Sequence, residues 1–228
     1  MTIFDNYTAI KQIVNETALT CGRNPGEIRI IAVSKTFPVA DINEAIAHGI
    51  TLFGENRIQE AKEKKPLITG NHSLHLIGHL QSNKAKEAIR LFDCIHSIDK
   101  FETAEKVNHE AFAADKVQEI LVQVNTSGEA SKSGCSPRDA LMICKKISQL
   151  KNIRLSGLMT IGPLTDNKDS VKLAFSLLRQ LRDSISQETG LPLKDLSMGM
   201  SGDFEAAIIE GATLLRIGSA IFGNRTYA

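Results

Sequence analysis

The 228-residue sequence has almost no excess of charge, since 27 basic residues stand against 26 acidic ones and the net charge is +1. This balance provides no basic surface for nucleic acid or for an anionic membrane, and we expect neither partner. No hydrophobic run approaches the ~18 residues of a membrane span. Residues 1–5 also lack the basic and apolar regions of a secretion signal. We therefore expect a cytoplasmic protein.

Cysteines are few and show no pairing pattern. Cys21, Cys94, Cys135 and Cys144 include no Cys-x-x-Cys pair, and we interpret them as free thiols in a reducing compartment. Cys135 lies in a loop rich in serine and glycine, where we expect it to be exposed. The sequence has neither a P-loop nor a Gly-x-Gly-x-x-Gly motif, so these two nucleotide-binding patterns do not apply.

Eight short apolar runs alternate with helical patterns along the chain, as expected for parallel strands buried on both faces. They span residues 30–33, 51–53, 74–77, 94–96, 119–124, 155–159, 196–198 and 214–217. This alternation predicts an α/β fold, and eight units favour a single closed (β/α)8 TIM barrel over an open, doubly wound sheet. Such barrels have about 200–250 residues. We therefore predict one domain over residues 1–228, with an extra N-terminal helix at about 5–20.

Several helices carry start or stop signals. Ser136 followed by Pro137 predicts a helix whose N-cap is the serine and whose first residue is the proline. Apolar residues recur at helical spacing from 171 to 185, and Gly190 is expected to close that helix. A further short helix is predicted over residues 41–47. These helices occupy links between the predicted strands.

Lys35 ends the first predicted strand. In barrels of this class the active site lies at the carboxyl ends of the strands, so this lysine is a candidate functional residue. Burial would lower its pKa and favour the neutral amine, which is the form that attacks an aldehyde. Its position alone favours a lysine that reaches solvent or pairs with a carboxylate, because charged groups are rarely buried without a partner.

The turns after the seventh and eighth runs form a candidate phosphate site, because barrels often bind phosphate with these two loops. Ser201 and Ser219 offer hydroxyl groups, while Gly202 and Gly218 let the backbone approach a ligand closely. Taken singly, these glycines are also compatible with simple tight turns. Together with Lys35, the two loops predict a phosphorylated aldehyde as the ligand, because such a molecule would use both features.

Arg216 and a pair of histidines lie close to these segments. Arg216 can face the barrel interior and meet a ring nitrogen of the ligand, or it can form a surface salt bridge. An arginine beside a pyridine nitrogen keeps that nitrogen unprotonated and weakens the ring as an electron sink. His75 and His79 are four residues apart on a predicted strand without an evident third ligand, so we expect no metal site. His79 at the strand end can still line the pocket.

Five longer motifs resemble the pyridoxal phosphate homeostasis proteins. They are AVSKT at 32–36, FGENRIQE at 53–60, HLIGHLQSNK at 75–84, LSMGMSGD at 196–203 and RIGSAIFG at 216–223. The resemblance covers nearly the whole chain in order. One departure is Leu74, where an aromatic residue often precedes the histidine of the third strand. The resemblance implies a fold like the N-terminal barrel of alanine racemase, known as fold type III.

The resemblance also implies a cofactor, pyridoxal 5′-phosphate (PLP), and a role for each matching position. Lys35 would carry PLP as a Schiff base, Arg216 would face the pyridine nitrogen, and Asn56 would lie beside the cofactor. Three residues would hold the phosphate: Ser201, Gly218 and Ser219. We therefore expect cofactor-binding residues, and no catalytic ones, at these positions.

Three functions are compatible with these residues. The first is PLP homeostasis, in which the protein binds, buffers or delivers PLP to apo PLP-dependent enzymes and affects amino-acid and keto-acid pools indirectly. The second is a PLP-dependent amino-acid racemase, which needs a second base, whereas the only tyrosines are Tyr7 and Tyr227. The third is an aldolase that forms a Schiff base on Lys35 and uses Glu55 as an acid or base. We favour the first, in a monomer without catalytic turnover.

Overall fold

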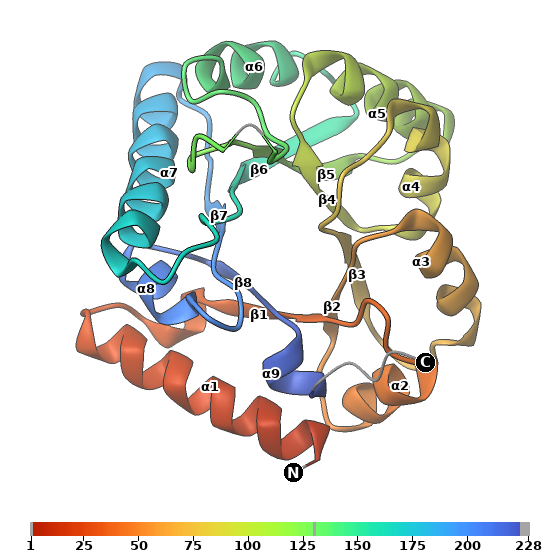
Figure 1. The fold of residues 1–228 in the computed structure, drawn as a ribbon. Coiled ribbons are helices and arrows are strands. Elements are labelled where there is room, and N and C mark those ends of the chain that lie inside the picture. The colour runs from red at the N-terminus through yellow and green to blue at the C-terminus, as the bar shows by residue number, and fades with distance from the viewer. Residues whose placement is uncertain (1, 130, 224–228) are drawn as a thin grey trace.

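The computed structural model describes residues 2–129 and 131–223 and shows a closed barrel of eight parallel strands (Figure 1). Each strand pairs with the next along the chain, and β8 pairs with β1 to close the ring. The strands are β1 (Arg29–Val33), β2 (Leu52–Glu55), β3 (Ser73–Leu76), β4 (Cys94–Ile98), β5 (Gln118–Gln123), β6 (Ile153–Met159), β7 (Asp195–Ser197) and β8 (Leu214–Ile217). The predicted TIM barrel is confirmed, and the open doubly wound sheet is excluded.

Helices follow the strands and surround the barrel (Figure 1). The α-helices are α1 (Ile3–Thr20), α2 (Val39–Ala47), α3 (Ile58–Lys64), α4 (Ala85–Leu91), α5 (Phe101–Ala113), α6 (Ala140–Ile147), α7 (Lys168–Thr189), α8 (Phe204–Ile209) and α9 (Ser219–Phe222). Three short 3-10 helices lie at Pro25–Glu27, Lys65–Leu67 and Ser82–Lys84. None of the helices in the described part of the chain is long and apolar enough to cross a membrane.

The helix ends follow the sequence signals in one case and depart from them in another. The N-terminus of α7 is capped by Asn167, and its C-terminus is capped by Gly190 with a positive φ of 72°. The predicted start at Ser136 and Pro137 is wrong, because α6 begins at Ala140. The Ser136 hydroxyl donates to the Asp139 carboxylate at 2.7 Å, and this turn delays the helix by three residues.

Side chains alternate between two apolar layers along the strands, apart from an irregularity in β4 between Ile95 and Ile98. In β1, Ile30 and Ala32 belong to the large layer between strands and helices, whereas Ile31 and Val33 belong to a smaller cluster that fills the barrel interior. The same alternation holds in β8, where Leu215 and Ile217 belong to the outer layer. Because side chains alternate with a period of two, the parity of a residue determines whether it faces the interior.

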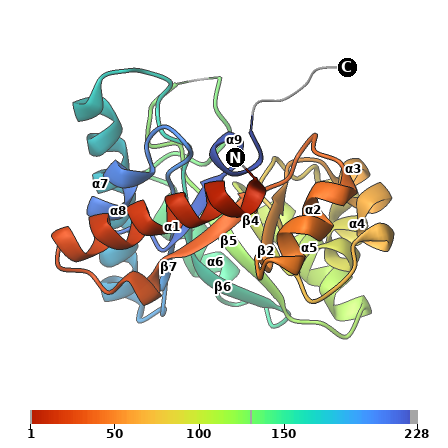
Figure 2. The ribbon, with the colours of Figure 1, turned by 90° about the horizontal axis from the view of Figure 1, so that it is seen from below.

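Helix α1 supports the segment that follows β8. Figure 2 shows α1 running across the outside of the barrel, and it packs against α8 and α9. The Asn6 side chain donates to the Ile221 carbonyl at 2.9 Å, and the Arg23 guanidinium donates to the Ile208 carbonyl at 2.7 Å. The first helix of the chain therefore braces the two helices that follow the last two strands.

Candidate functional site

A cavity of about 610 Å³ opens at the carboxyl ends of the strands. All six residues predicted to bind a cofactor line it: Lys35, Asn56, Ser201, Arg216, Gly218 and Ser219. Gly202 and His79, which the sequence also singled out, line the same cavity. The structure thus brings together residues from β1, β2, β7, β8 and the loops that follow them.

Lys35 reaches the cavity because of its place in the alternation. Ile31 and Val33 face the barrel interior, so Lys35 points to the same side, while Ser34 points outward. Lys35 is half-buried and is the second residue after the end of β1. The next residue, Thr36, has a φ of 69°, a left-handed conformation that is rare for a β-branched residue. The backbone therefore turns sharply just after the lysine.

The two predicted phosphate loops meet as neighbours. The hydroxyls of Ser201 and Ser219 lie 3.4 Å apart, and the Ala220 amide points to the Ser201 hydroxyl at 3.4 Å. Both contacts are long for hydrogen bonds and therefore weak. Val33 lies 3.5 Å from the position of a Cβ on Gly218, which places this loop beside the end of β1. Hydroxyl and amide donors thus gather in the loops that follow β7 and β8, beside the end of β1 and Lys35.

Arg216 forms the floor of the cavity. Arg216 lies opposite Ile31 in the register of β1 and β8, which places it deeper in the barrel than Lys35. The guanidinium is almost fully buried, donating to the Ser197 hydroxyl at 2.6 Å and to the Thr160 carbonyl at 2.8 Å. Burial lowers the pKa of Arg216 to about 10, although the nearby Asp203 carboxylate opposes this shift. The alternative of a surface salt bridge is therefore excluded.

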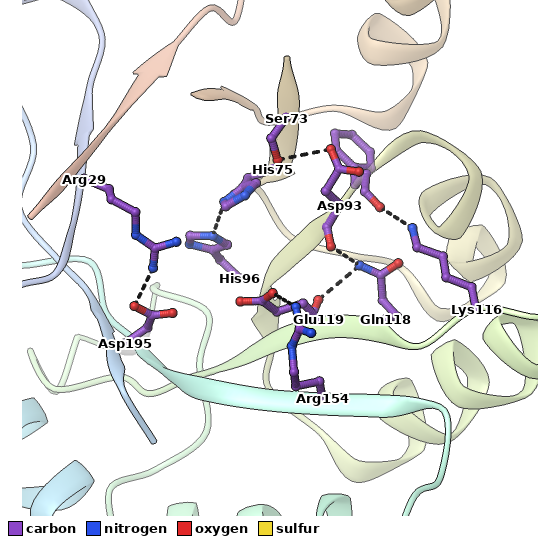
Figure 3. Close-up of polar contacts among 11 residues, drawn as sticks. Arg29, Ser73, His75, Asp93, His96, Lys116, Gln118, Glu119, Arg154 and Asp195 are labelled. Atoms are coloured by element: carbon purple, nitrogen blue, oxygen red, sulfur yellow. Dashed lines mark hydrogen bonds and ion pairs between the residues drawn. The ribbon is translucent and has the colours of Figure 1, made fainter. Parts of the chain in front are cut away.

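A chain of hydrogen bonds continues from Arg216 toward the other end of the barrel. The Ser197 hydroxyl contacts Nδ1 of His96 at 2.9 Å. Nε2 of His96 in turn contacts Nδ1 of His75 at 2.9 Å, and Figure 3 shows these two imidazoles facing each other. Burial lowers the pKa of His75 to about 4 and that of His96 well below its ordinary value, so both imidazoles are neutral at pH 7. We call His75, His96, Ser197 and Arg216 the inner polar chain.

The amino ends of the strands are closed by ion pairs around this chain. Figure 3 shows Arg29 with Asp195 at 2.6 Å, and Arg154 with Glu119. Both arginines are largely exposed, so solvent screens these pairs. This end of the barrel therefore has a structural role, and the cavity lies at the opposite end.

Within the described residues, one group of side chains has the composition and spacing to hold a metal ion. It consists of His75, Cys94 and His96, whose potential ligand atoms lie within 4.8 Å of one another. The two histidines are joined directly by the hydrogen bond described above. Burial raises the pKa of the Cys94 thiol well above its ordinary value, which opposes the thiolate that metal binding requires. The hydrogen-bond partner of His75 is thus His96, not His79. The side chains of His75, Cys94 and His96 pack in the interior of the barrel.

The sequence interpretation missed several residues that line the cavity, among them Gln123 and Lys132. Lys132 lies in the loop after β5, donates to the Gly162 carbonyl at 2.5 Å and pairs with Glu129 at 2.8 Å. The rule that loops after barrel strands carry function would have marked this lysine. Cys135, predicted to be exposed, is buried, because its backbone pairs with Val124, the residue that follows β5.

Glu55 lies outside the cavity. Its neighbour Gly54 faces the interior, where an added Cβ would lie 2.8 Å from the Ile31 side chain. Glu55 therefore points outward, where it is buried, accepts from the Ser34 hydroxyl at 2.7 Å and pairs with Lys64 at 3.0 Å. The acid or base role of Glu55 in the aldolase alternative is thus wrong.

Comparisons with known proteins agree with this geometry. Residues 6–226 match the family model of the alanine racemase N-terminal domain. The pyridoxal phosphate homeostasis protein of Pseudomonas aeruginosa is 41% identical over 227 residues, which cover 99% of this chain and 97% of the relative. PipY of Synechococcus elongatus PCC7942, solved with PLP bound, has a TM-score of 0.82 at 36% identity, covering 92% of this chain and all of PipY.

An alanine racemase from Clostridium difficile 630 shares the fold alone, with a TM-score of 0.76 at 16% identity over 96% of this chain and 57% of the racemase. The full-length relatives are much closer in sequence, and their coverage leaves no large segment of either chain unmatched. The chain therefore belongs to the alanine racemase N-terminal-domain family and, within it, to the pyridoxal phosphate homeostasis proteins.

Proposed function

We propose that this protein binds PLP as a Schiff base on Lys35 and buffers or delivers it, without catalytic turnover of its own. The observation that carries this proposal is the meeting of an amine, two hydroxyls and a buried guanidinium in one cavity. The bound PLP of PipY and the names of the curated relatives support it.

The residues present fit the cofactor. When bound, PLP supplies an aldehyde that condenses with an amine and a ring that withdraws electrons. Lys35 would receive the aldehyde, and Asn56 would lie beside the ring. Ser201 and Ser219 would donate hydroxyl hydrogens to the phosphate, together with the backbone at Gly218. Their mutual contact at 3.4 Å is weak enough to be replaced by charge-assisted hydrogen bonds to the phosphate.

Arg216 favours a carrier over a racemase. Its guanidinium is held by Ser197 and Thr160 and stays protonated at neutral pH, so it would keep a facing pyridine nitrogen unprotonated. A ring in that state is a weaker electron sink, which disfavours proton removal from an amino acid. Tyr7 lies on α1, outside the barrel, and Tyr227 lies outside the described residues.

We also propose that a monomer delivers PLP to apo PLP-dependent enzymes in a reducing compartment such as the cytoplasm. All four cysteines are free thiols, which supports the choice of compartment. Loaded protein mixed with an apo enzyme should restore that enzyme's activity, and light scattering should give a mass near 24.9 kDa. A mass of twice that value would contradict the monomer. An apo enzyme that gains no activity would contradict the delivery of PLP.

The Schiff base is tested by absorbance, reduction and mass mapping. We expect purified protein incubated with PLP to absorb in the Schiff-base band, and borohydride to fix a pyridoxyl group on Lys35. The Lys35→Ala variant should fold normally and lose the adduct, because a half-buried rim residue contributes little packing. An adduct that maps to Lys132, or one that persists in Lys35→Ala, would overturn the assignment.

A further inference from the structure

Both neighbours of Lys35 are held from outside the barrel by one polar cluster. We call Ser34, Thr36, Glu55, Glu60 and Lys64 the outer clamp. Glu60 and Lys64 lie one turn apart on α3, the helix that follows β2. The clamp therefore sits on the far side of β1 from the cavity, and Lys35 is the residue between its two contact points.

Ser34 is fixed through both its side chain and its backbone. Its hydroxyl donates to Oε1 of Glu55 at 2.7 Å, and its carbonyl accepts from Nζ of Lys64 at 2.8 Å. Lys64 also donates to Oε1 of Glu55 at 3.0 Å, which closes a triangle of contacts. The peptide group that joins Ser34 to Lys35 is thus held at its oxygen.

Thr36 is fixed through its amide. The Thr36 N–H donates to Oε1 of Glu60 at 2.5 Å, and the same oxygen accepts from Nζ of Lys64 at 2.6 Å. The φ of 69° at Thr36 is unfavourable for a β-branched residue and persists only where neighbouring contacts hold it. The Glu60 carboxylate supplies such a contact, so the turn after Lys35 depends on α3.

The clamp is buried enough for its charges to matter. Glu55 is 1% exposed, the Lys64 side chain is 11% exposed, and Oε2 of Glu55 has no hydrogen-bond partner within residues 2–129 and 131–223. Burial raises the pKa of Glu55, while Lys64 and the Ser34 hydroxyl oppose that shift. Removal of Lys64 would leave a buried carboxylate unpaired, so the three charged groups hold one another in place.

We propose that Glu55, Glu60 and Lys64 are positioning residues that set the direction of Lys35 for Schiff-base formation. The inference rests on the proposed function. In that reaction the amine nitrogen of Lys35 forms a C=N bond to the aldehyde carbon, and the carbonyl oxygen leaves as water with the two amine protons. The reaction requires the amine to meet the aldehyde of a ligand already held by its phosphate, so a misdirected Lys35 affects this step alone.

Two ligands separate this role from a structural one. Pyridoxine 5′-phosphate has an alcohol in place of the aldehyde of PLP, so it makes the same non-covalent contacts and forms no Schiff base. For Lys64→Met we expect Kd for PLP to rise on the order of tenfold, with Kd for pyridoxine 5′-phosphate changed less than twofold. Lys62→Met is the matched control, because Lys62 is exposed on the same helix, and both constants should stay at the wild-type value.

If Lys64→Met does not fold, two variants of Glu60 test the same positioning role. Glu60→Ala removes the acceptor for the Thr36 amide and should weaken PLP selectively, whereas Glu60→Gln keeps an acceptor oxygen and should restore most of the affinity. An equal rise of Kd for both ligands would show that these residues have only a structural role. An unchanged Kd for PLP would show that they do not influence Lys35. Either result overturns the inference. A wild-type protein without an adduct would overturn the proposed function itself, and the inference with it.

Discussion

At the scale of the residue, side chains that are adjacent in sequence point to opposite sides of a strand. Ser34 faces the helices and Lys35 faces the cavity, although both follow the same short strand. On β8, Ile217 packs outward while Arg216 lies under the cavity. Adjacent residues therefore face the packed layer and the cavity separately, and single substitutions can test one without the other.

Ser219→Ala tests the phosphate contact. Loss of one charge-assisted hydrogen bond should raise Kd for PLP about fivefold or more. Kd for pyridoxal, which has no phosphate, should not change, and Ser170→Ala on the exposed start of α7 provides the control. Titration monitored by absorbance measures each constant, and an equal loss for pyridoxal and PLP would rule out a phosphate contact.

Ser197→Ala tests the support beneath Arg216. The substitution removes the acceptor for Nη1 of Arg216 and the partner of His96, so the free energy of unfolding should fall by about 1–3 kcal/mol. Ser97→Ala is a matched control, because the Ser97 hydroxyl is buried without a hydrogen-bond partner among the described residues. Denaturant unfolding measures both, and equal losses for the two serines would show that the contact to Arg216 contributes nothing.

At the scale of the element, the eight strands could be predicted because a parallel strand covered on both faces must be apolar throughout. Their bounds shifted by one or two residues, as in β6, which begins at Ile153 rather than Leu155. Four of the residues that line the cavity, Lys35, Ser201, Gly218 and Ser219, could be predicted to share one rim because they follow barrel strands. Arg216 was singled out by its place on the eighth strand, whereas a role for Asn56 came only from the family resemblance. This part of the prediction depends on local pattern and on general barrel geometry.

Other features depend on partners distant in the sequence, and local pattern does not show them. The start of α6 was misplaced because the Ser136 hydroxyl, which accepts from the Asp139 amide and donates to the Asp139 carboxylate, closes a turn that precedes the helix. The outward direction of Glu55 depends on Lys64 and on the register of β2 beside β1. The contact between His75 and His96 joins two strands, and its burial follows only from the closed ring.

Gly78→Ala tests how closely the ends of β2 and β3 approach. A Cβ at Gly78 would lie 2.2 Å from the Asn56 carbonyl oxygen, so the backbone must move, at a cost of about 1–3 kcal/mol. Gly202→Ala is the control, because no atom lies within 4 Å of its Cβ position. Thermal unfolding should show a lower midpoint for Gly78→Ala alone, and an unchanged midpoint would contradict the close approach.

At the scale of the whole molecule, the inner polar chain joins two ends of the barrel with different tasks. The amino end is closed by ion pairs, and the carboxyl end carries the cavity. His75 and His96 lie between them, in an interior that they share with Ser197, Arg216 and a cluster of apolar side chains. Burial keeps both imidazoles neutral, so the stability of the whole barrel depends on pH.

Acid should destabilise the fold through these histidines. Their pKa values are lower in the folded state than the unfolded value near 6.5, so the unfolded chain binds protons first as pH falls. The contribution of the neutral histidines to stability is complete above a pH of about 6.5 and should fall by up to about 1.4 kcal/mol per pH unit for each histidine. For His75 the loss continues until the pH reaches its folded-state pKa of about 4. Denaturant unfolding across this range measures the slope, which a His75→Gln, His96→Gln double variant should largely lose.

The pairing of β1 with β8 also has a consequence for synthesis of the protein. Lys35 emerges early from the ribosome, whereas Arg216 and Ser219 emerge only with the eighth strand and the segment that follows it. These residues become neighbours only when the ring closes. On the proposed assignment of the site, a nascent chain without β8 has the amine but lacks a loop for the phosphate, and PLP should be captured only after translation of the eighth strand is complete.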